Sequence, residues 1–425
     1  MKAAAGRQPL PLYTGFLTGW GATTFGTGLM LPLTVAYLRE VLGLPTSGVS
    51  LYFALFAVAG LAVNPLAGRI GRIHGPGLPA IGATVLQAAG AAWLALADSM
   101  AATVPAACLS GAGTGAYYAV QTPLLTKVFG TSHLSRVLSG QHRVSALTVA
   151  VGALLGGQAV EHLGEGGYTL CVVANAASYL LYGATLVRLR RAVGRPAGPG
   201  ADREDPGAPR ADPGERGTAA LRDPVFRRLL LLQTALVVFG LAQVDAVVPA
   251  ILRNAHLSVS AVSVVVACNT VGVIAFQGLA LRVVERIGYV AALMAAILVW
   301  VVAMAALTAA VLVPGTGVRL LLGALFGLVF AVGECLIAPS VQPLVTLAAP
   351  AARLESYAAA TSLAHGLGAF VAPLVLLPVV DGGGVWSYLA LQLGGYALAL
   401  YALLSFRGRS ARPLAAPVLS KEAPP

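Results

Sequence analysis

Residues 289–313 read YVAALMAAILVWVVAMAALTAAVLV, a run without a single charged side chain. A helix needs about 20 apolar residues to cross the hydrocarbon core of a bilayer. A transmembrane β-strand would instead alternate polar and apolar residues over about ten positions. The run therefore predicts a transmembrane α-helix.

The rest of the chain repeats this pattern. Hydrophobic residues make up 57% of the sequence and charged residues only 10%, whereas a soluble protein normally carries about 25% charged residues. So few charges cannot coat a water-facing surface, and we expect an all-α integral membrane protein of twelve transmembrane helices. The predicted spans are roughly 12–38, 48–67, 78–97, 101–127, 144–160, 168–187, 229–252, 258–281, 289–313, 319–346, 354–378 and 385–406.

One stretch interrupts the apolar pattern. Residues 191–222 read RAVGRPAGPGADREDPGAPRADPGERGTAALR, which is rich in proline, glycine and mixed charge. Such a segment has too few apolar residues to bury a core, and we expect a cytoplasmic disordered linker. It separates a six-helix bundle at 1–190 from a second one at 223–407, and residues 408–425 are expected to form a cytoplasmic tail.

The two predicted bundles align with each other. A constant shift of 217 residues pairs Pro32 with Pro249, and Arg69-Ile70-Gly71 with Arg286-Ile287-Gly288. One offset that serves several spans indicates an internal duplication, and hence two pseudo-symmetric bundles. Many secondary transporters consist of such repeats, which rock about a site at the membrane midplane.

The positive charges predict the orientation of the spans. Of the 27 lysines and arginines, only Arg39, Arg253 and Arg319 fall in the loops on one side of the predicted membrane. Cytoplasmic loops carry the excess of positive charge, so we expect a plasma-membrane protein with both termini in the cytoplasm. The net charge of +11 is therefore a topology signal, and we expect no nucleic acid as partner.

Residues 64–72 read NPLAGRIGR, in the loop predicted between spans two and three. This motif resembles the major facilitator superfamily, in which the loop reads roughly G-x-L-A-D-R-x-G-R-[RK]. Arg69, Gly71 and Arg72 fit the family pattern. Asn64 replaces its first glycine, and Gly68 replaces its acidic residue.

The second half carries a related motif at Glu285, Arg286 and Gly288, with an acid at the position paired with Gly68. Gly71 and Gly288 are expected to form tight turns with positive φ, and the basic side chains to bind the carbonyl ends of nearby helices. The resemblance implies a cytoplasmic gating latch. The alternative is a basic loop that only sets topology.

Span five ends with the glycines Gly152, Gly156 and Gly157. The segment resembles the G-P-x-x-G-G motif of proton-driven exporters, with Ala153 in place of the proline. Small residues let two helices approach closely, so ordinary helix packing is the alternative interpretation. Span four lacks the embedded arginine that many proton antiporters of this family carry.

Three ionisable residues lie inside the apolar runs: Asp245 in span seven, Glu334 in span ten and His365 in span eleven. A charge within the bilayer is costly, so each is a candidate for proton or substrate binding. The alternatives are a hydrogen-bonded neutral carboxyl, a solvated position near the outer mouth, and a neutral imidazole in helix packing. In the family, spans one, four, seven and ten line the central cavity. Further cavity-lining candidates are Thr23, Thr27, Tyr117, Tyr118, Gln121 and Asn269.

These features together predict a secondary active transporter. No nucleotide-binding loop or catalytic motif of a soluble enzyme is present, so we expect no enzyme activity, no cofactor and no metal. We expect a monomer that couples protons to the efflux of small, moderately apolar molecules by alternating access. The alternatives are an uptake symporter or facilitator on the same fold, and a membrane enzyme or lipid-handling protein without coupled transport.

Overall fold

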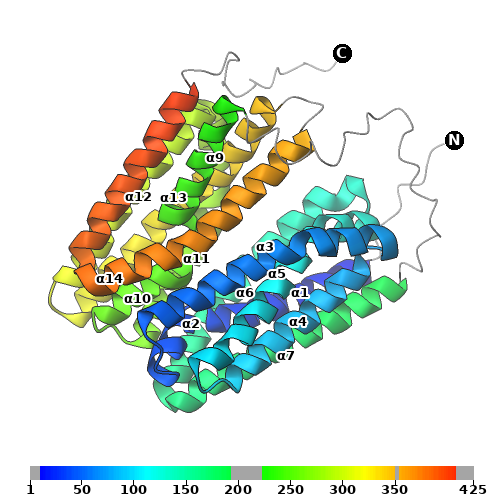
Figure 1. The fold of residues 1–425 in the computed structure, drawn as a ribbon, viewed down its shortest axis with the longest axis horizontal. Helices are drawn as coiled ribbons and strands as arrows, with labels where there is room; N and C mark the ends of the chain where they lie inside the picture. The colour runs from blue at the N-terminus through cyan, green and yellow to red at the C-terminus, as the bar shows by residue number, and fades with distance from the viewer. Residues whose placement is uncertain (1–9, 193–222, 350–353, 408–425) are drawn as a thin grey trace. The chain divides into compact units, whose positions relative to one another are not determined.

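The computed structural model describes residues 10–192, 223–349 and 354–407 (Figure 1). All regular secondary structure in these ranges is helical, which confirms the all-α prediction. The predicted tail, and the predicted linker after residue 192, lie outside the described residues.

The first part of the chain forms the elements α1 (Leu10–Met30), α2 (Thr34–Ala36), η1 (Tyr37–Val41), α3 (Thr46–His74), α4 (Gly77–Ala95), α5 (Met100–Phe129), α6 (Thr131–Leu163) and α7 (Glu165–Ala192). The second part forms α9 (Pro224–Leu236), η2 (Val237–Leu241), η3 (Gln243–Val247), α10 (Val248–Asn254), α11 (Val259–Ile287), α12 (Tyr289–Leu312), α13 (Thr316–Ala348) and α14 (Leu354–Arg407). The η elements are single turns of π-helix.

Among the described residues, nine continuous helical segments are long and apolar enough to cross a membrane. One of them, Ala360–Phe406, has 47 residues and holds two spans, because the helix breaks at Gly384 with φ 66° and ψ −168°. α1 and α5 have 21 and 30 residues, which is sufficient length, but they contain more glycine and threonine than the other spans. The nine segments, the additional span in α14, and α1 and α5 give the twelve predicted spans.

Helix ends follow local chemistry. Asp223 caps α9, since its Oδ1 accepts hydrogen bonds from the backbone of Val225 at 2.8 Å and of Phe226 at 3.2 Å. Gly130 separates α5 from α6 with a φ of 79°, a conformation that glycine adopts without strain. α6 begins at residue 131, well before the predicted span at 144, and Arg136, His142 and Arg143 in this extension are exposed.

The described chain divides into two compact units. The first contains α1 to α7 and also residues 245–267, and the second contains residues 223–244 and the described residues from 268 onward. In the first unit, α1 packs on α6 and α7, and α5 packs on both α3 and α4 (Figure 1). Aromatic side chains from α1, α5 and α7, including Phe16, Tyr117 and Tyr182, fill its core.

The core of the second unit is built around Trp300 of α12. Its ring is fully buried and stacks on Phe330 at a centroid distance of 5.1 Å, and its Nε1 donates to the Phe330 carbonyl oxygen. A Cβ atom at Gly240 of η2 or at Gly333 of α13 would collide with this ring. The two glycines therefore make the space into which Trp300 inserts.

Candidate functional site

A carboxylate and an amide meet between α11 and α13. Asn269 Nδ2 donates to Glu334 Oε2 at 2.8 Å and also contacts the Gly327 carbonyl oxygen at 3.4 Å. Asn269 is buried and Glu334 is half-buried. The helices come close because Gly272 has no side chain to collide with Ala331. Two residues that the sequence predicts separately therefore form one polar site.

His365 lies on α14 and pairs with span seven. Its Nδ1 lies 3.3 Å from Nε2 of Gln233 in α9. The imidazole is exposed, whereas the Gln233 side chain is buried. This contact links α14 to α9 in the second unit. His365 therefore pairs with Gln233 and is separate from the contact between Asn269 and Glu334.

Asp245 occupies the π-helical part of span seven, and its side chain is exposed. Two residues earlier, the fully buried Gln243 belongs to a polar network that the sequence analysis missed. Gln243 Nε2 donates to the Val238 carbonyl oxygen at 2.6 Å, and Tyr388 donates to Gln243 Oε1 at 2.7 Å. Gln392 in turn donates to the Tyr388 hydroxyl at 2.9 Å. The network satisfies polar groups where span seven leaves α-helical geometry.

Removing the central hydroxyl of this network is expected to destabilise the second unit. Tyr388→Phe leaves the buried Gln243 Oε1 without its donor, and an unsatisfied buried polar group costs about 1–3 kcal/mol. We expect a lower unfolding temperature of the purified protein by differential scanning fluorimetry. Tyr401→Phe is the matched control, because Tyr401 is exposed on the same helix. Equal unfolding temperatures for the two variants would contradict this role.

The polar and aromatic side chains of α1 and α5 differ in exposure. Tyr118 is 64% exposed, whereas Tyr117 is buried, stacks on Trp20 at 5.6 Å and hydrogen-bonds the hydroxyl of Tyr182. Thr27 is exposed, with its Oγ1 3.4 Å from the hydroxyl of Tyr179 in α7. Thr23 is buried and Gln121 half-buried. Of the cavity-lining candidates in the first unit, Tyr118 and Thr27 present the most accessible surface.

The three glycines of span five contact two different elements. A Cβ atom at Gly152 would lie 2.4 Å from the Phe25 carbonyl oxygen, and one at Gly156 would lie 2.5 Å from that of Leu29. These two glycines let α6 approach the backbone of α1. Gly157 faces Ser263 at the start of α11, where a Cβ atom would lie 2.4 Å from the serine hydroxyl.

The basic motif of the first half lies at the end of α3. Arg69 and Arg72 are exposed, Gly68 has open space around it, and Asn64 is half-buried with its Oδ1 enclosed. The arginines are therefore free of the helical core and lie where they are accessible to other elements.

The turn in this motif differs from the prediction. Gly71 lies inside α3, and the residue with positive φ is Gly75, at 82°. Gly288 does have positive φ, at 81°. α3 and α11 start at 46 and 259 and end at 74 and 287, an offset of 213 rather than 217. By this offset of the helix ends, the turn glycine Gly75 corresponds to Gly288. Glu285 and Arg286 are both exposed.

Comparisons with known proteins identify the fold. The family model of the Major Facilitator Superfamily matches residues 15–373. No curated protein matches the sequence. The nucleoside transporter NupG superposes with a TM-score of 0.73 at 11% identity, over 95% of this chain and 100% of that one.

Two other solved structures are similarly close. An auto-inhibited peptide transporter of the POT family gives a TM-score of 0.71 at 16% identity, over 97% of this chain and 99% of that one. A bacterial homologue of the iron transporter ferroportin gives 0.71 at 15% identity, over 96% and 100%. At identities this low, the superpositions show a shared fold and nothing more. The family model matches most of the chain and establishes the family. The chain belongs to the Major Facilitator Superfamily and is a multi-pass membrane transporter, not an enzyme.

Proposed function

We propose that this transporter exports small, moderately apolar molecules in exchange for protons, by alternating access. The observation that carries the proposal is the hydrogen bond from Asn269 to Glu334. A carboxylate inside a membrane helix is costly and marks functional positions by default. The Asn269 amide holds the Glu334 carboxyl group in place, and the half-buried side chain keeps part of its surface accessible. A fixed and partly accessible acid in an apolar span suits a group that binds and releases a proton in each cycle.

In the proposed cycle, Glu334 holds a proton while the transporter is open to the outside. It releases the proton to the cytoplasm, and its carboxylate then favours binding of substrate from that side. Asp245 is the second candidate for the proton carrier, because its exposed carboxylate also lies in a predicted cavity helix. His365 is a third, and Tyr118 and Thr27 are the proposed substrate contacts from the first unit.

The proposal includes the setting of the chain in its membrane. The distribution of lysine and arginine supports a plasma-membrane protein with both termini in the cytoplasm. Its halves, at 1–190 and 223–407, would move as two six-helix bundles joined by a cytoplasmic linker. The arginines of the α3 motif and Arg286 would act at the cytoplasmic side, and the protein would function as a monomer.

The direction of transport can be tested in inverted membrane vesicles. The probe is a compound to which expression of the chain confers tolerance. Acidifying the vesicle lumen is expected to drive accumulation of this compound inside, because the inverted lumen corresponds to the outside of the cell. Vesicles without the protein are the control. Loss of the compound from the lumen under the same gradient would contradict export and indicate an uptake symporter.

A further inference from the structure

Three polar side chains follow one face of α14 in the second unit. Tyr388, Gln392 and Tyr396 are spaced four residues apart, so they lie above one another on the helix. None of the three is more than 3% exposed. Buried polar atoms are almost always hydrogen-bonded, so the partners of these side chains show what this face of the helix can hold.

Two backbone carbonyl groups fix the directions of the hydrogen bonds around Gln243. The Val238 carbonyl oxygen can only accept, so the nitrogen of the Gln243 amide faces it, at 2.6 Å. The Phe239 carbonyl oxygen faces the nitrogen of the Gln392 amide in the same way, at 3.4 Å. Gln243 Oε1 therefore takes the proton of Tyr388, whose oxygen accepts from Gln392. Tyr388 has no proton left for the amide oxygen of Gln392.

Two buried polar atoms on this face have no hydrogen-bond partner among the described residues: Gln392 Oε1 and the Tyr396 hydroxyl. The first can only accept, the second can donate, and their side chains are one helical turn apart. The Tyr396 ring stacks on the fully buried Trp300 at a centroid distance of 6.0 Å, which keeps it from turning toward Gln392. An acceptor and a donor held in this way are suited to a bridging water.

We propose that the second unit binds one water molecule between Gln392 and Tyr396. The water accepts the proton of the Tyr396 hydroxyl and donates to Gln392 Oε1, so both buried atoms are satisfied. Buried waters typically bind about two to four otherwise unsatisfied polar groups. Met304 lies beside this site, with its Sδ 3.8 Å from both the Tyr388 hydroxyl and Gln392 Nε2.

The water completes a chain of hydrogen bonds that ends in span seven. In order from donor to acceptor, its members are Tyr396, the water, Gln392, Tyr388, Gln243 and the Val238 carbonyl group. Each member donates to the next, and hydrogen bonds aligned in this way strengthen one another. Val238 lies in η2, where span seven leaves α-helical geometry. The chain therefore fixes this irregular segment from inside the second unit.

The sign of the stability change in Tyr396→Phe tests for the water. With the water bound, loss of the hydroxyl leaves Gln392 Oε1 without a donor, and the unfolding temperature falls. Without it, the hydroxyl is an unpaired polar group in a buried site, and its removal raises the unfolding temperature. We expect a fall, measured by differential scanning fluorimetry on the full chain. The matched control is Tyr401→Phe, which changes an exposed tyrosine of the same helix and is expected to be neutral. An unchanged or raised unfolding temperature in Tyr396→Phe would overturn the water site.

Radiolytic oxidation distinguishes a bridging water from a direct hydrogen bond between the two side chains. An X-ray pulse generates hydroxyl radicals from ordered waters, and these oxidise adjacent side chains that bulk solvent does not reach. Met304, which is 1% exposed, is the reporter, and the buried Met30 of α1 is the internal dose control. We expect oxidation of Met304 in the original protein and in Tyr401→Phe, and its loss in Tyr396→Phe.

Two outcomes of this experiment would overturn the proposal: no oxidation of Met304 above the level of Met30 in the original protein, or equal oxidation of Met304 in the original protein and in Tyr396→Phe. Neither oxidation nor thermal unfolding requires substrate or a proton gradient. The water site can therefore fail or succeed independently of the proposed proton coupling.

Discussion

Glu334→Gln is expected to abolish proton-driven transport while exchange of substrate across the membrane continues. Glutamine has nearly the shape of glutamate and can still bond to the Asn269 amide through its oxygen, but it neither binds nor releases a proton in the physiological range. We expect the rate of gradient-driven accumulation in proteoliposomes to fall at least about a hundredfold, since a step that requires ionisation is lost. Counterflow of labelled against unlabelled substrate measures the exchange that remains.

Two variants make this result specific. Glu165→Gln removes an exposed carboxylate of α7 and is expected to retain driven transport. Asp245→Asn tests the second carrier candidate, since its carboxylate is also accessible. Driven transport that survives in Glu334→Gln and disappears in Asp245→Asn would move the proton site to span seven. Survival in both variants would remove the embedded acids from the mechanism.

The double substitution Gly152→Ala/Gly156→Ala is expected to cause the largest loss of stability. The added methyl groups would lie 2.4 and 2.5 Å from backbone oxygen atoms of α1. Backbone atoms cannot rotate away, so α6 and α1 must separate along this contact. Overpacking of this kind costs about 1–3 kcal/mol per site, and two sites one turn apart would cost about 2–6 kcal/mol together.

The measurement is the unfolding temperature of the purified protein, together with the yield of monodisperse protein. Gly15→Ala/Gly82→Ala is the matched control, because a Cβ atom at either position meets no atom within 4 Å. That control is expected to be neutral or slightly stabilising, because alanine is a better helix former than glycine. Equal stability of the two double variants would mean that the span-five glycines do not set the distance between α6 and α1.

The fold was predictable because membrane spans are encoded locally. Apolar length alone places a span such as 289–313, and the structure has α12 at Tyr289–Leu312. The start of α6 was not predictable in this way, since residues 131–143 are polar and helical at once. The turn at Gly75 was missed for a related reason: a glycine can lie inside a helix, as Gly71 does, and sequence alone does not show which glycine ends it.

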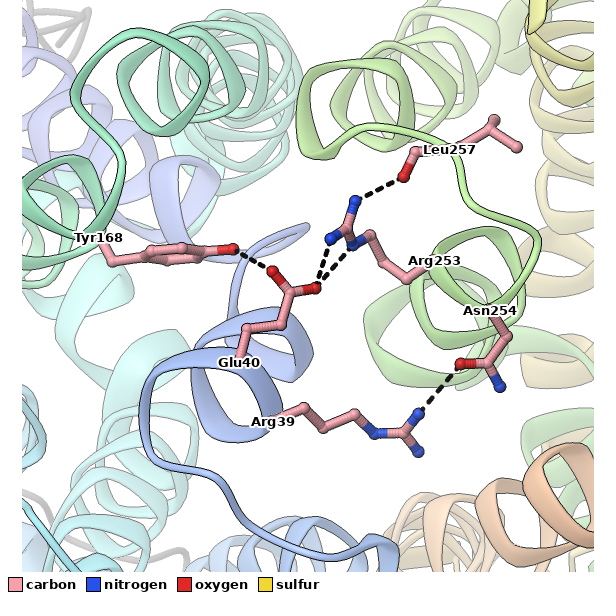
Figure 2. Close-up of polar contacts among 6 residues, drawn as sticks. All are labelled: Arg39, Glu40, Tyr168, Arg253, Asn254 and Leu257. Atoms are coloured by element: carbon pink, nitrogen blue, oxygen red, sulfur yellow. Dashed lines mark hydrogen bonds and ion pairs between the residues drawn. The ribbon is translucent and has the colours of Figure 1, made fainter.

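The candidate site was predictable only in part. An acid such as Glu334 is conspicuous in an apolar run, and so is Asn269, but their pairing depends on how α11 and α13 pack. Buried amides such as Gln243 and Gln392 are equally visible as polar residues, yet their role depends on Tyr388 from the far end of the chain. The contact between Glu40 and Arg253 (Figure 2) joins residues 213 positions apart, in the short helical elements η1 and α10, and nothing in either local sequence indicates the partner.

The most direct test of proton-coupled export is the sign of proton movement driven by substrate alone. Proteoliposomes are loaded with the transported compound and a pH-sensitive dye, clamped electrically with potassium and valinomycin, and diluted into compound-free buffer. Exchange of substrate for protons predicts that the lumen acidifies as the compound leaves, whichever way the protein is inserted, and that Glu334→Gln abolishes this change. A lumen that becomes alkaline, or one that keeps its pH while the compound leaves, would contradict the account.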